Sequence, residues 1–139
     1  MNLTIATIAK QINASFEGDA SLLIDAISID SRSLQNGPHT LFFALIGPNN
    51  DAHSYIIDLI QQGVTHFVVQ YIPEDCVGKA HFLVVQNTLA ALQELASYHR
   101  SLFHFPVIGV TGSNGKTIVK EWLNFLLSPD YSIIRSPKS

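Results

Sequence analysis

The sequence predicts an α/β fold in which short apolar strands alternate with amphipathic helices. Three runs are typical of buried strands, because they are rich in β-branched and aromatic residues and lie between turn-forming residues: 40–46, 65–69 and 81–85. Residues 54–62 carry apolar side chains at helical spacing and end at Gly63. A strand, helix and strand of this size favour parallel pairing of the two strands.

Elements before residue 40 extend the same part of the chain. Thr4 is placed to cap a first helix that runs to about Asn13, because apolar side chains follow at three- and four-residue spacing: Ile5, Ile8 and Ile12. Residues 16–23 are expected to form a loop or a weak strand, and residues 27–31 alternate apolar and polar side chains as a half-buried strand does. Residues 35–38 have the composition of a turn.

A longer helix is expected after the last of these strands. Asn87 is predicted to cap it, and its apolar side should consist of Leu89, Leu92, Leu95, Ala96, His99 and Leu102. Pro106 cannot extend that helix, so a domain boundary is expected next to it. We therefore predict a small mixed or parallel sheet domain with helices over residues 1–104.

The remaining residues, 105–139, predict the beginning of a second domain. Residues 106–110 form an apolar run typical of a strand, residues 116–127 have the pattern of a helix, and residues 131–135 are typical of another strand. A parallel α/β sheet usually has more strands than this and has both faces covered. We therefore expect the truncated start of a central domain, and a chain that is the N-terminal fragment of a longer protein.

The turn before the second helix has the composition of a phosphate-binding loop. The candidate residues are Thr111, Gly112, Ser113, Asn114, Gly115, Lys116, Thr117 and Ile118. Backbone N–H groups would face the anion, and Lys116 would be the catalytic charge. The Thr117 hydroxyl would ligate Mg²⁺, so ATP and Mg²⁺ are the expected cofactors. The usual spacing requires glycine at Val110, so an ordinary turn with a solvated Lys116 is the alternative.

Composition restricts the other functions. The net charge is −3 without a basic cluster, which argues against nucleic-acid binding. No apolar run approaches the roughly 20 residues of a membrane span, and the first residues do not have the pattern of a signal peptide. The lone Cys76 fits a reducing compartment, and the six histidines lack metal-ligand spacing. We expect a cytoplasmic monomer without a membrane partner, with Trp122 in its core.

These residues resemble the Mur ligase family, the ATP-dependent amide-bond-forming enzymes of bacterial peptidoglycan precursor synthesis. Residues 111–117, Thr-Gly-Ser-Asn-Gly-Lys-Thr, are similar to the family's own phosphate loop, which also lacks the earlier glycine. Residues 30–32, 41–47 and 51–53 resemble its N-terminal domain, which holds the uridine nucleotide end of the substrate. Residues 3–9 and the Lys120-Glu121 pair look most like the member that adds D-alanyl-D-alanine to UDP-N-acetylmuramoyl-tripeptide.

The resemblance implies a reaction through an acyl phosphate. The tripeptide carboxylate would attack the γ-phosphate of ATP, and the amine of D-alanyl-D-alanine would then displace phosphate. By the same resemblance, the uridine site consists of Ile29, Ser31, Arg32, Asn49 and Asn50. The family's other metal and carbamate ligands would lie after Ser139, so residues 1–139 alone are expected to be inactive.

Other interpretations stay open from the sequence. The related ligase that adds the third residue to UDP-N-acetylmuramoyl-dipeptide has a similar pattern, and some members are fused to an alanine racemase. A generic phosphate-loop NTPase or kinase is a second class, and a non-catalytic module that binds uridine nucleotides is a third. Residues 30–32 are also explained by a strand-end turn with a surface ion pair.

Overall fold

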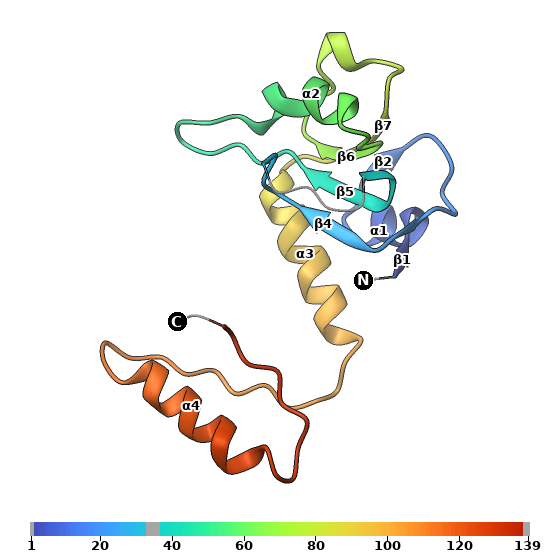
Figure 1. Ribbon diagram of the computed structural model, residues 1–139. Coiled ribbons are helices and arrows are strands. Elements are labelled where there is room, and N and C mark those ends of the chain that lie inside the picture. Colours follow the sequence, from blue (N-terminus) through green and yellow to red (C-terminus); the bar gives the residue numbers. More distant parts are fainter. Residues whose placement is uncertain (1, 33–36, 138–139) are drawn as a thin grey trace. The chain divides into compact units, whose positions relative to one another are not determined.

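The computed structural model describes residues 2–32 and 37–137, and the chain divides into two compact units, Met1–Phe103 and His104–Ser139 (Figure 1). The first unit is built on a five-stranded sheet of order β2-β7-β6-β5-β4. Its strands are β2 (Ser15–Phe16), β4 (Ala26–Ser28), β5 (Thr40–Phe43), β6 (His66–Val69) and β7 (His81–Val84). Strands β4 to β7 pair in parallel, and β2 joins β7 antiparallel. The predicted mixed α/β sheet is therefore confirmed.

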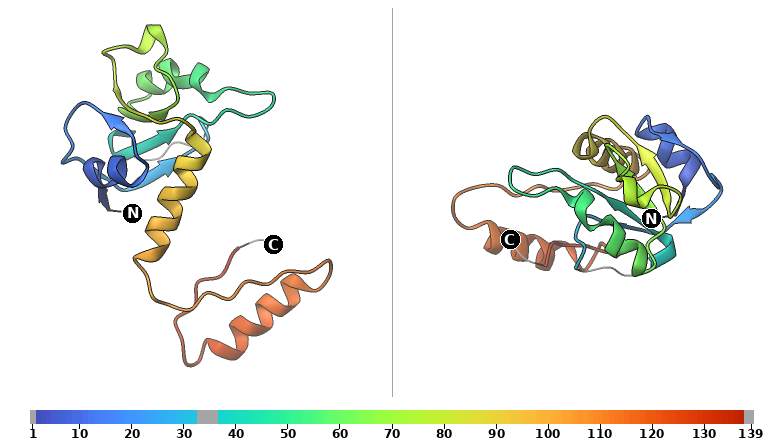
Figure 2. Two further views of the ribbon diagram at one scale, coloured as in Figure 1. Left: turned by 180° about the vertical axis from the view of Figure 1, so that it is seen from behind. Right: turned by 90° about the horizontal axis from the view of Figure 1, so that it is seen from above.

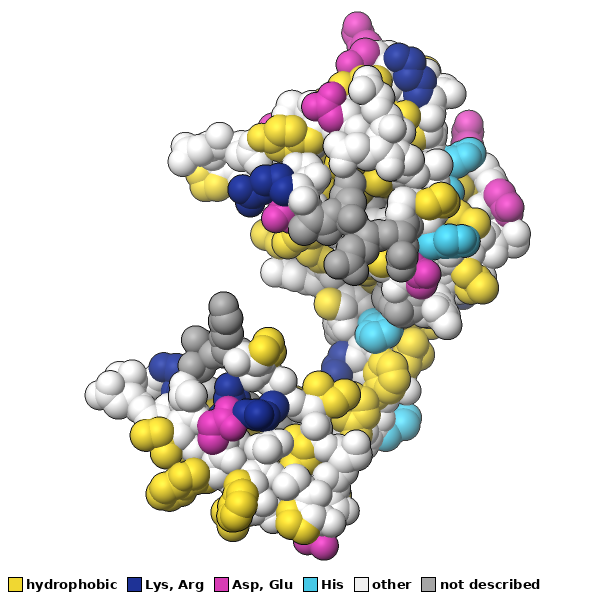
Figure 3. Space-filling model, in the orientation of Figure 1, with side chains coloured by type: hydrophobic (Ala, Val, Ile, Leu, Met, Phe, Trp, Pro, Cys, Tyr) yellow, Lys and Arg dark blue, Asp and Glu magenta, His cyan; other side chains and the backbone are white. Residues whose placement is uncertain are grey.

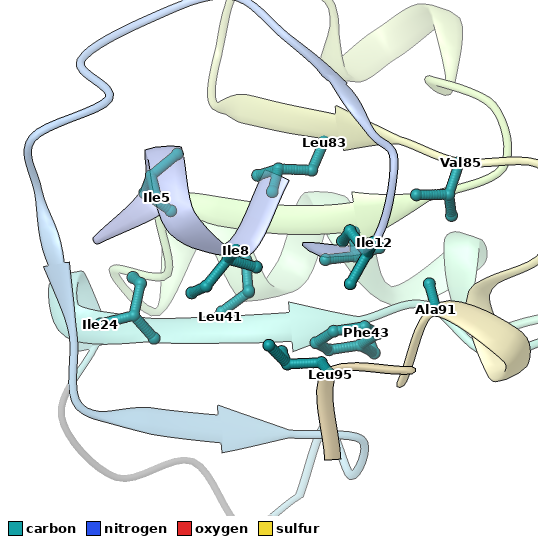
Figure 4. Packing of buried hydrophobic residues seen from close by; sticks show 11 residues of the cluster. Ile5, Ile8, Ile12, Ile24, Leu41, Phe43, Leu83, Val85, Ala91 and Leu95 are labelled. Carbon is teal, nitrogen blue, oxygen red and sulfur yellow. The ribbon is translucent and has the colours of Figure 1, made fainter. Parts of the chain in front are cut away.

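Helices cover both faces of this sheet (Figure 2). Helices α1 (Ile5–Gln11) and α3 (Thr88–Ser101) pack on one face, and α2 (Ile56–Gln61) packs on the other. The faces alternate along β5, because Leu41 and Phe43 join the first cluster while Phe42 joins the second. Figure 4 shows α1 side chains pointing toward β5 in the first cluster. None of the helices in residues 2–32 and 37–137 has the length and apolarity to span a membrane.

The starts of α1 and α3 agree with the predicted caps. The Thr4 hydroxyl accepts a hydrogen bond from the Thr7 N–H at 3.2 Å, and the Asn87 side chain accepts one from the Ala90 N–H at 2.9 Å. The predicted apolar side of α3 is wrong in part. Its buried residues are Thr88, Ala91 and Leu95, whereas Leu89 and Leu102 are exposed.

Other predicted elements are shorter or shifted. The strand expected at residues 27–31 is β4, which ends at Ser28. The segment expected to be a loop or weak strand begins and ends in two-residue strands, β2 and β3 (Leu23–Ile24), and β3 pairs with β1 (Leu3–Thr4). Of the turn predicted at residues 35–38, the first two residues lie outside the described residues. Its other half belongs to the 3₁₀ turn Gly37–His39.

The second unit contains α4 (Lys116–Leu127), with the predicted bounds. No strand forms at residues 106–110 or 131–135, which lie in the described part of the chain, so these two predictions are wrong. A strand requires a hydrogen-bonded neighbour, and neither segment has one there. Trp122 is 68% exposed and no residue of α4 is buried, so its prediction as a core residue is also wrong. Figure 3 shows apolar side chains gathered on the surface over α4.

Candidate functional site

The glycine-containing turn of the second unit leads directly into α4. Gly115 is the N-cap of α4 with φ +78°, a left-handed conformation that favours glycine, and it has no side chain to cap the helix. The first helical hydrogen bond runs from the Val119 N–H to the Gly115 carbonyl at 3.0 Å. Gly115 therefore offers no side-chain acceptor to the amides of the first turn.

Lys116 lies at the edge of this turn. Its Nζ donates a hydrogen bond to the Gly112 carbonyl at 2.5 Å, across the loop. Gly112 itself has φ +146°, which again favours glycine. A positive side chain next to a helix N-terminus adds to the positive end of the helix dipole. The electrostatic field at this turn therefore favours a bound anion.

A hollow of about 370 Å³ opens at the turn. It is lined by Ser113, Asn114, Gly115, Lys116, Thr117 and Ile118, which are six of the eight residues predicted for the phosphate loop. Thr111 and Gly112 precede the hollow and are exposed. The loop predicted from the sequence is thus brought together around one concave surface, even though the strand predicted before it is absent.

The residues predicted for the uridine site lie at one edge of the first unit. Ile29, Ser31 and Arg32 follow the carboxyl end of β4, and Asn49 and Asn50 follow the carboxyl end of β5. Because β4 and β5 are parallel, both groups lie at the same edge of the sheet. Ligands of open α/β sheets bind outside the carboxyl ends of the strands, which makes this edge the natural place for a substrate.

Residues 30–32 form a strand-end turn with an ion pair. The Asp30 carboxylate accepts hydrogen bonds from the Arg32 backbone N–H at 3.0 Å and from Arg32 Nε at 3.1 Å. These hydrogen bonds lower the pKa of Asp30 below its ordinary value. Ile29 is exposed and Ser31 is half-buried. The simpler interpretation of this segment is therefore present in the structure, and a ligand role for Ser31 and Arg32 stays a prediction.

The segment that carries Asn49 and Asn50 is a narrow loop projecting from the end of β5 (Figures 1 and 2). The loop closes on itself, because the Gly47 N–H donates to the Asn50 carbonyl at 2.8 Å and Ile46 pairs with Asp51. The Tyr55 hydroxyl donates to Asn50 Oδ1 at 3.0 Å. The loop thus has a defined conformation, with both asparagines exposed.

A polar cluster lies at the base of that loop, and of its three residues the sequence pointed to Asp51 and His53 but not to Tyr71. Asp51 Oδ1 lies 2.6 Å from His53 Nδ1, and Asp51 Oδ2 accepts a hydrogen bond from the Tyr71 hydroxyl at 2.6 Å. Burial opposes ionisation of Asp51, but the hydrogen bonds from Tyr71 and His53 lower its pKa below the ordinary value. The hydrogen bond to Asp51 raises the pKa of Tyr71. The only sequence signal was the Asp-Ala-His segment, because Tyr71 lies 20 residues away from Asp51.

The sheet of the first unit and the turn before α4 define a class of protein: an α/β protein with a glycine-lysine-threonine turn at the start of a helix. No family model matches the chain. The chain is 36% identical over 121 residues to UDP-N-acetylmuramoyl-tripeptide--D-alanyl-D-alanine ligase of Haemophilus influenzae, covering 87% of this chain and 26% of that protein. It is also 36% identical over 104 residues to UDP-N-acetylmuramoyl-L-alanyl-D-glutamate--2,6-diaminopimelate ligase of Bacteroides thetaiotaomicron, covering 73% and 21%.

Solved structures give the same result. A crystal structure of MurF from Acinetobacter baumannii matches with a TM-score of 0.82 and 29% identity, covering 99% of this chain and 30% of that one. MurF ligase from Thermotoga maritima in complex with ADP matches with a TM-score of 0.66 and 28% identity, covering 81% and 25%. Over most of its own length the chain is thus similar to ligases of the Mur family, chiefly to those of the MurF type. It spans about a quarter of the length of the curated relatives it matches.

Proposed function

We propose that this chain is part of an ATP-dependent ligase that adds D-alanyl-D-alanine to UDP-N-acetylmuramoyl-tripeptide. Residues 1–104 would bind the uridine nucleotide, and residues 105–139 would begin the ATP-binding domain. The observation that supports this proposal most strongly is the glycine-lysine-threonine turn that caps α4 and follows an α/β sheet unit. The similarity to ligases named for this reaction covers both parts of the chain.

The turn before α4 fits the phosphate tail of ATP. Its capping glycine has no side chain that would occupy the N-terminus of α4, and a hollow lies beside it, so an anion can approach the positive end of the helix dipole. Lys116 would leave the Gly112 carbonyl and contact a phosphate oxygen, and the Thr117 hydroxyl would hold Mg²⁺. When bound, MgATP would supply the phosphoryl group that activates the tripeptide carboxylate. The role of these residues is positioning and electrostatic stabilisation of the charge on the phosphoryl oxygens.

The carboxyl edge of the parallel sheet would hold the uridine end of the substrate. Ser31 and Arg32 offer a hydroxyl and a cation after β4, and Asn49 and Asn50 offer amide groups after β5. Ile29 is 54% exposed at the same edge and offers an apolar surface. This combination of apolar and polar groups suits a nucleoside with an attached diphosphate.

Titration calorimetry of this chain with ADP and Mg²⁺ tests the phosphate loop. Lys116→Met should weaken ADP binding by about tenfold or more, because a charge-assisted contact to phosphate is lost. Lys10→Met, the same substitution in α1, is the matched control and should bind ADP like the unsubstituted chain. Equal ADP affinity of the Lys116→Met chain would contradict the proposed role of the loop.

The reaction itself is tested in the gene product that contains this chain. Phosphate release should require UDP-N-acetylmuramoyl-tripeptide, D-alanyl-D-alanine and ATP together. A second candidate is the ligase that adds the third residue, which is favoured by the similarity to the diaminopimelate ligase. Turnover with UDP-N-acetylmuramoyl-dipeptide and diaminopimelate, but not with the first set of substrates, would replace the proposal with this candidate.

A further inference from the structure

The polar cluster at the base of the projecting loop joins two segments of the chain. We call Asp51, His53 and Tyr71 the loop anchor. Asp51 ends the loop through its pairing with Ile46, and His53 lies in the 3₁₀ turn Ala52–Tyr55 that follows. Tyr71 follows the carboxyl end of β6. The anchor therefore connects the loop after β5 with the segment after the neighbouring strand.

The hydrogen bonds of His53 determine its protonation pattern. Its Nε2 accepts a hydrogen bond from the Gln70 backbone N–H at 3.1 Å, so the ring proton is on Nδ1. Nδ1 then donates to Asp51 Oδ1 at 2.6 Å. The side chain of His53 is fully buried, and both of its nitrogens are occupied. His53 therefore acts through its neighbours and does not contact a substrate.

Asp51 accepts hydrogen bonds from both other residues of the loop anchor. Besides the His53 ring, it accepts hydrogen bonds from the His53 backbone N–H at 2.9 Å and from the Tyr71 hydroxyl at 2.6 Å. The Tyr71 ring stacks on the His53 ring with centroids 4.2 Å apart and an interplanar angle of 9°. Hydrogen bonds to a carboxylate are stronger than neutral ones, and the stacked ring covers one face of the imidazole. The last residue of the loop is thus held from two directions.

We propose that the loop anchor positions the loop at residues 46–51, so that Asn49 and Asn50 are placed to contact the uridine nucleotide. This inference rests on the proposed function. Asp51, His53 and Tyr71 are positioning residues, because each acts on the nucleotide only through the loop. A loop that is fixed before binding loses less conformational entropy when the nucleotide binds, so less of the binding free energy is needed to offset that loss.

Tyr71→Phe is the variant that tests the anchor. It removes one hydroxyl from a half-exposed side chain and keeps the ring that stacks on His53. Calorimetry with UDP-N-acetylmuramoyl-tripeptide should show binding weaker by about 3- to 10-fold, the effect of one lost hydrogen bond. Amide hydrogen exchange should become faster at Gly47, whose N–H bonds to the Asn50 carbonyl, while β6 is unchanged. ADP binding should not change, and the melting temperature should fall by a few degrees at most.

Tyr98→Phe, the same substitution on α3, is the matched control and should leave all four measurements unchanged. Equal nucleotide binding by the Tyr71→Phe and unsubstituted chains would overturn the inference. A parallel loss of melting temperature and ADP binding would also overturn it, since it would show a general structural role.

If the unsubstituted chain does not bind the nucleotide peptide, the proposed function fails. In that case, unchanged exchange at Gly47 in the Tyr71→Phe chain overturns the anchor as well, and faster exchange shows that the anchor holds the loop.

Discussion

The two units of this chain differ in how they use apolar side chains. In the first unit, phenylalanines and aliphatic residues on both faces of the sheet are fully buried, among them Phe42, Phe43 and Phe67. In the second unit, α4 has no buried residue, and Trp122, Phe125 and Leu126 are each more than 60% exposed. Nevertheless, α4 has the bounds that the sequence predicts, and the turn before it has its glycines in left-handed conformations.

The two units differ in this way because a helix is local structure, whereas a sheet requires segments that are distant in sequence. A helix satisfies its hydrogen bonds within one segment, so residues 116–127 suffice to form α4. A strand satisfies them only with a neighbouring strand, and residues 106–110 have none within the described chain. The geometry of the proposed phosphate loop therefore depends on the turn and the helix, whereas the proposed uridine site depends on a complete sheet.

The largest expected effect is a loss of stability, which we predict for a core phenylalanine and not for an exposed one. Phe67→Ala should lower the free energy of unfolding of the first unit by about 3–5 kcal/mol, because it leaves a cavity between β6 and its neighbours. Phe125→Ala is the matched variant in α4, where the side chain is 77% exposed, and it should change stability by less than about 0.5 kcal/mol. Urea unfolding followed by circular dichroism measures both.

Similar losses from the two phenylalanine substitutions would break the comparison. They would mean that the apolar surface of α4 is covered in solution. Phe82→Leu, which removes less volume from the same core cluster, gives an intermediate value if Phe67→Ala prevents folding.

Sequence patterns identified most elements of the first unit. The physical reason for this success also explains the errors. Apolar runs located β5, β6 and β7, because buried parallel strands must be apolar on both faces. The predicted side of α3 was partly wrong, because it was chosen by the largest apolar residues. The face that packs is instead defined by Thr88, whose hydroxyl donates to the Ala44 carbonyl at 3.0 Å, and by the small Ala91. A buried threonine with a distant backbone partner has no signature in sequence.

The next expected effect is a dependence of stability on pH that is specific to the first unit. Burial, and then the neighbouring His81, lower the pKa of His66 to about 4. In the unfolded chain His66 takes up a proton near pH 6.5, so between about pH 6.5 and 4 the unfolded state binds more protons. The free energy of unfolding should therefore fall as pH is lowered through this window. We expect this effect to be smaller than that of a core truncation, because at pH 5 only part of the interval between the two pKa values contributes to it.

The contribution of His66 is isolated by His66→Gln. The urea midpoint of this variant should change less between pH 7 and pH 5 than that of the unsubstituted chain. Asp19, His39 and His81 also interact with His66 and are present in both chains, so only the difference between the chains is assigned to His66. An identical pH dependence of the two chains would contradict the assignment.

A smaller effect on stability is expected at the N-termini of α3 and α4. Asn87→Ala should destabilise the first unit by about 1 kcal/mol, because the side-chain cap of α3 is lost, whereas Asn87→Ser should retain it. Gly115→Ala should cost about 1 kcal/mol in α4 for a different reason, the left-handed φ of +78°. Thermal unfolding of the first pair and helix content of the second measure these effects. An Asn87→Ala chain as stable as Asn87→Ser would contradict the capping role.

The candidate sites were only partly predictable. The proposed phosphate loop is contiguous in sequence, so its residues could be identified together, and six of them line one hollow. The loop anchor depends on Tyr71, which reaches Asp51 only because β5 and β6 are neighbours in the sheet. Residues 30–32 show the converse: the sequence identifies them, and the structure shows a turn that would form without any ligand.

The smallest expected effect on stability concerns two exposed ion pairs, one in each unit. Arg32 pairs with Asp30 at the carboxyl edge of the sheet, and Arg135 pairs with Glu121 beside α4. Exposed pairs contribute little to stability, so neither Arg32→Gln nor Arg135→Gln should change the unfolding midpoint measurably. Binding should distinguish them: Arg32→Gln should weaken the affinity for UDP-N-acetylmuramoyl-tripeptide, and Arg135→Gln should not. If both variants bind the nucleotide peptide like the unsubstituted chain, residues 30–32 are a strand-end turn and the uridine site does not include Arg32.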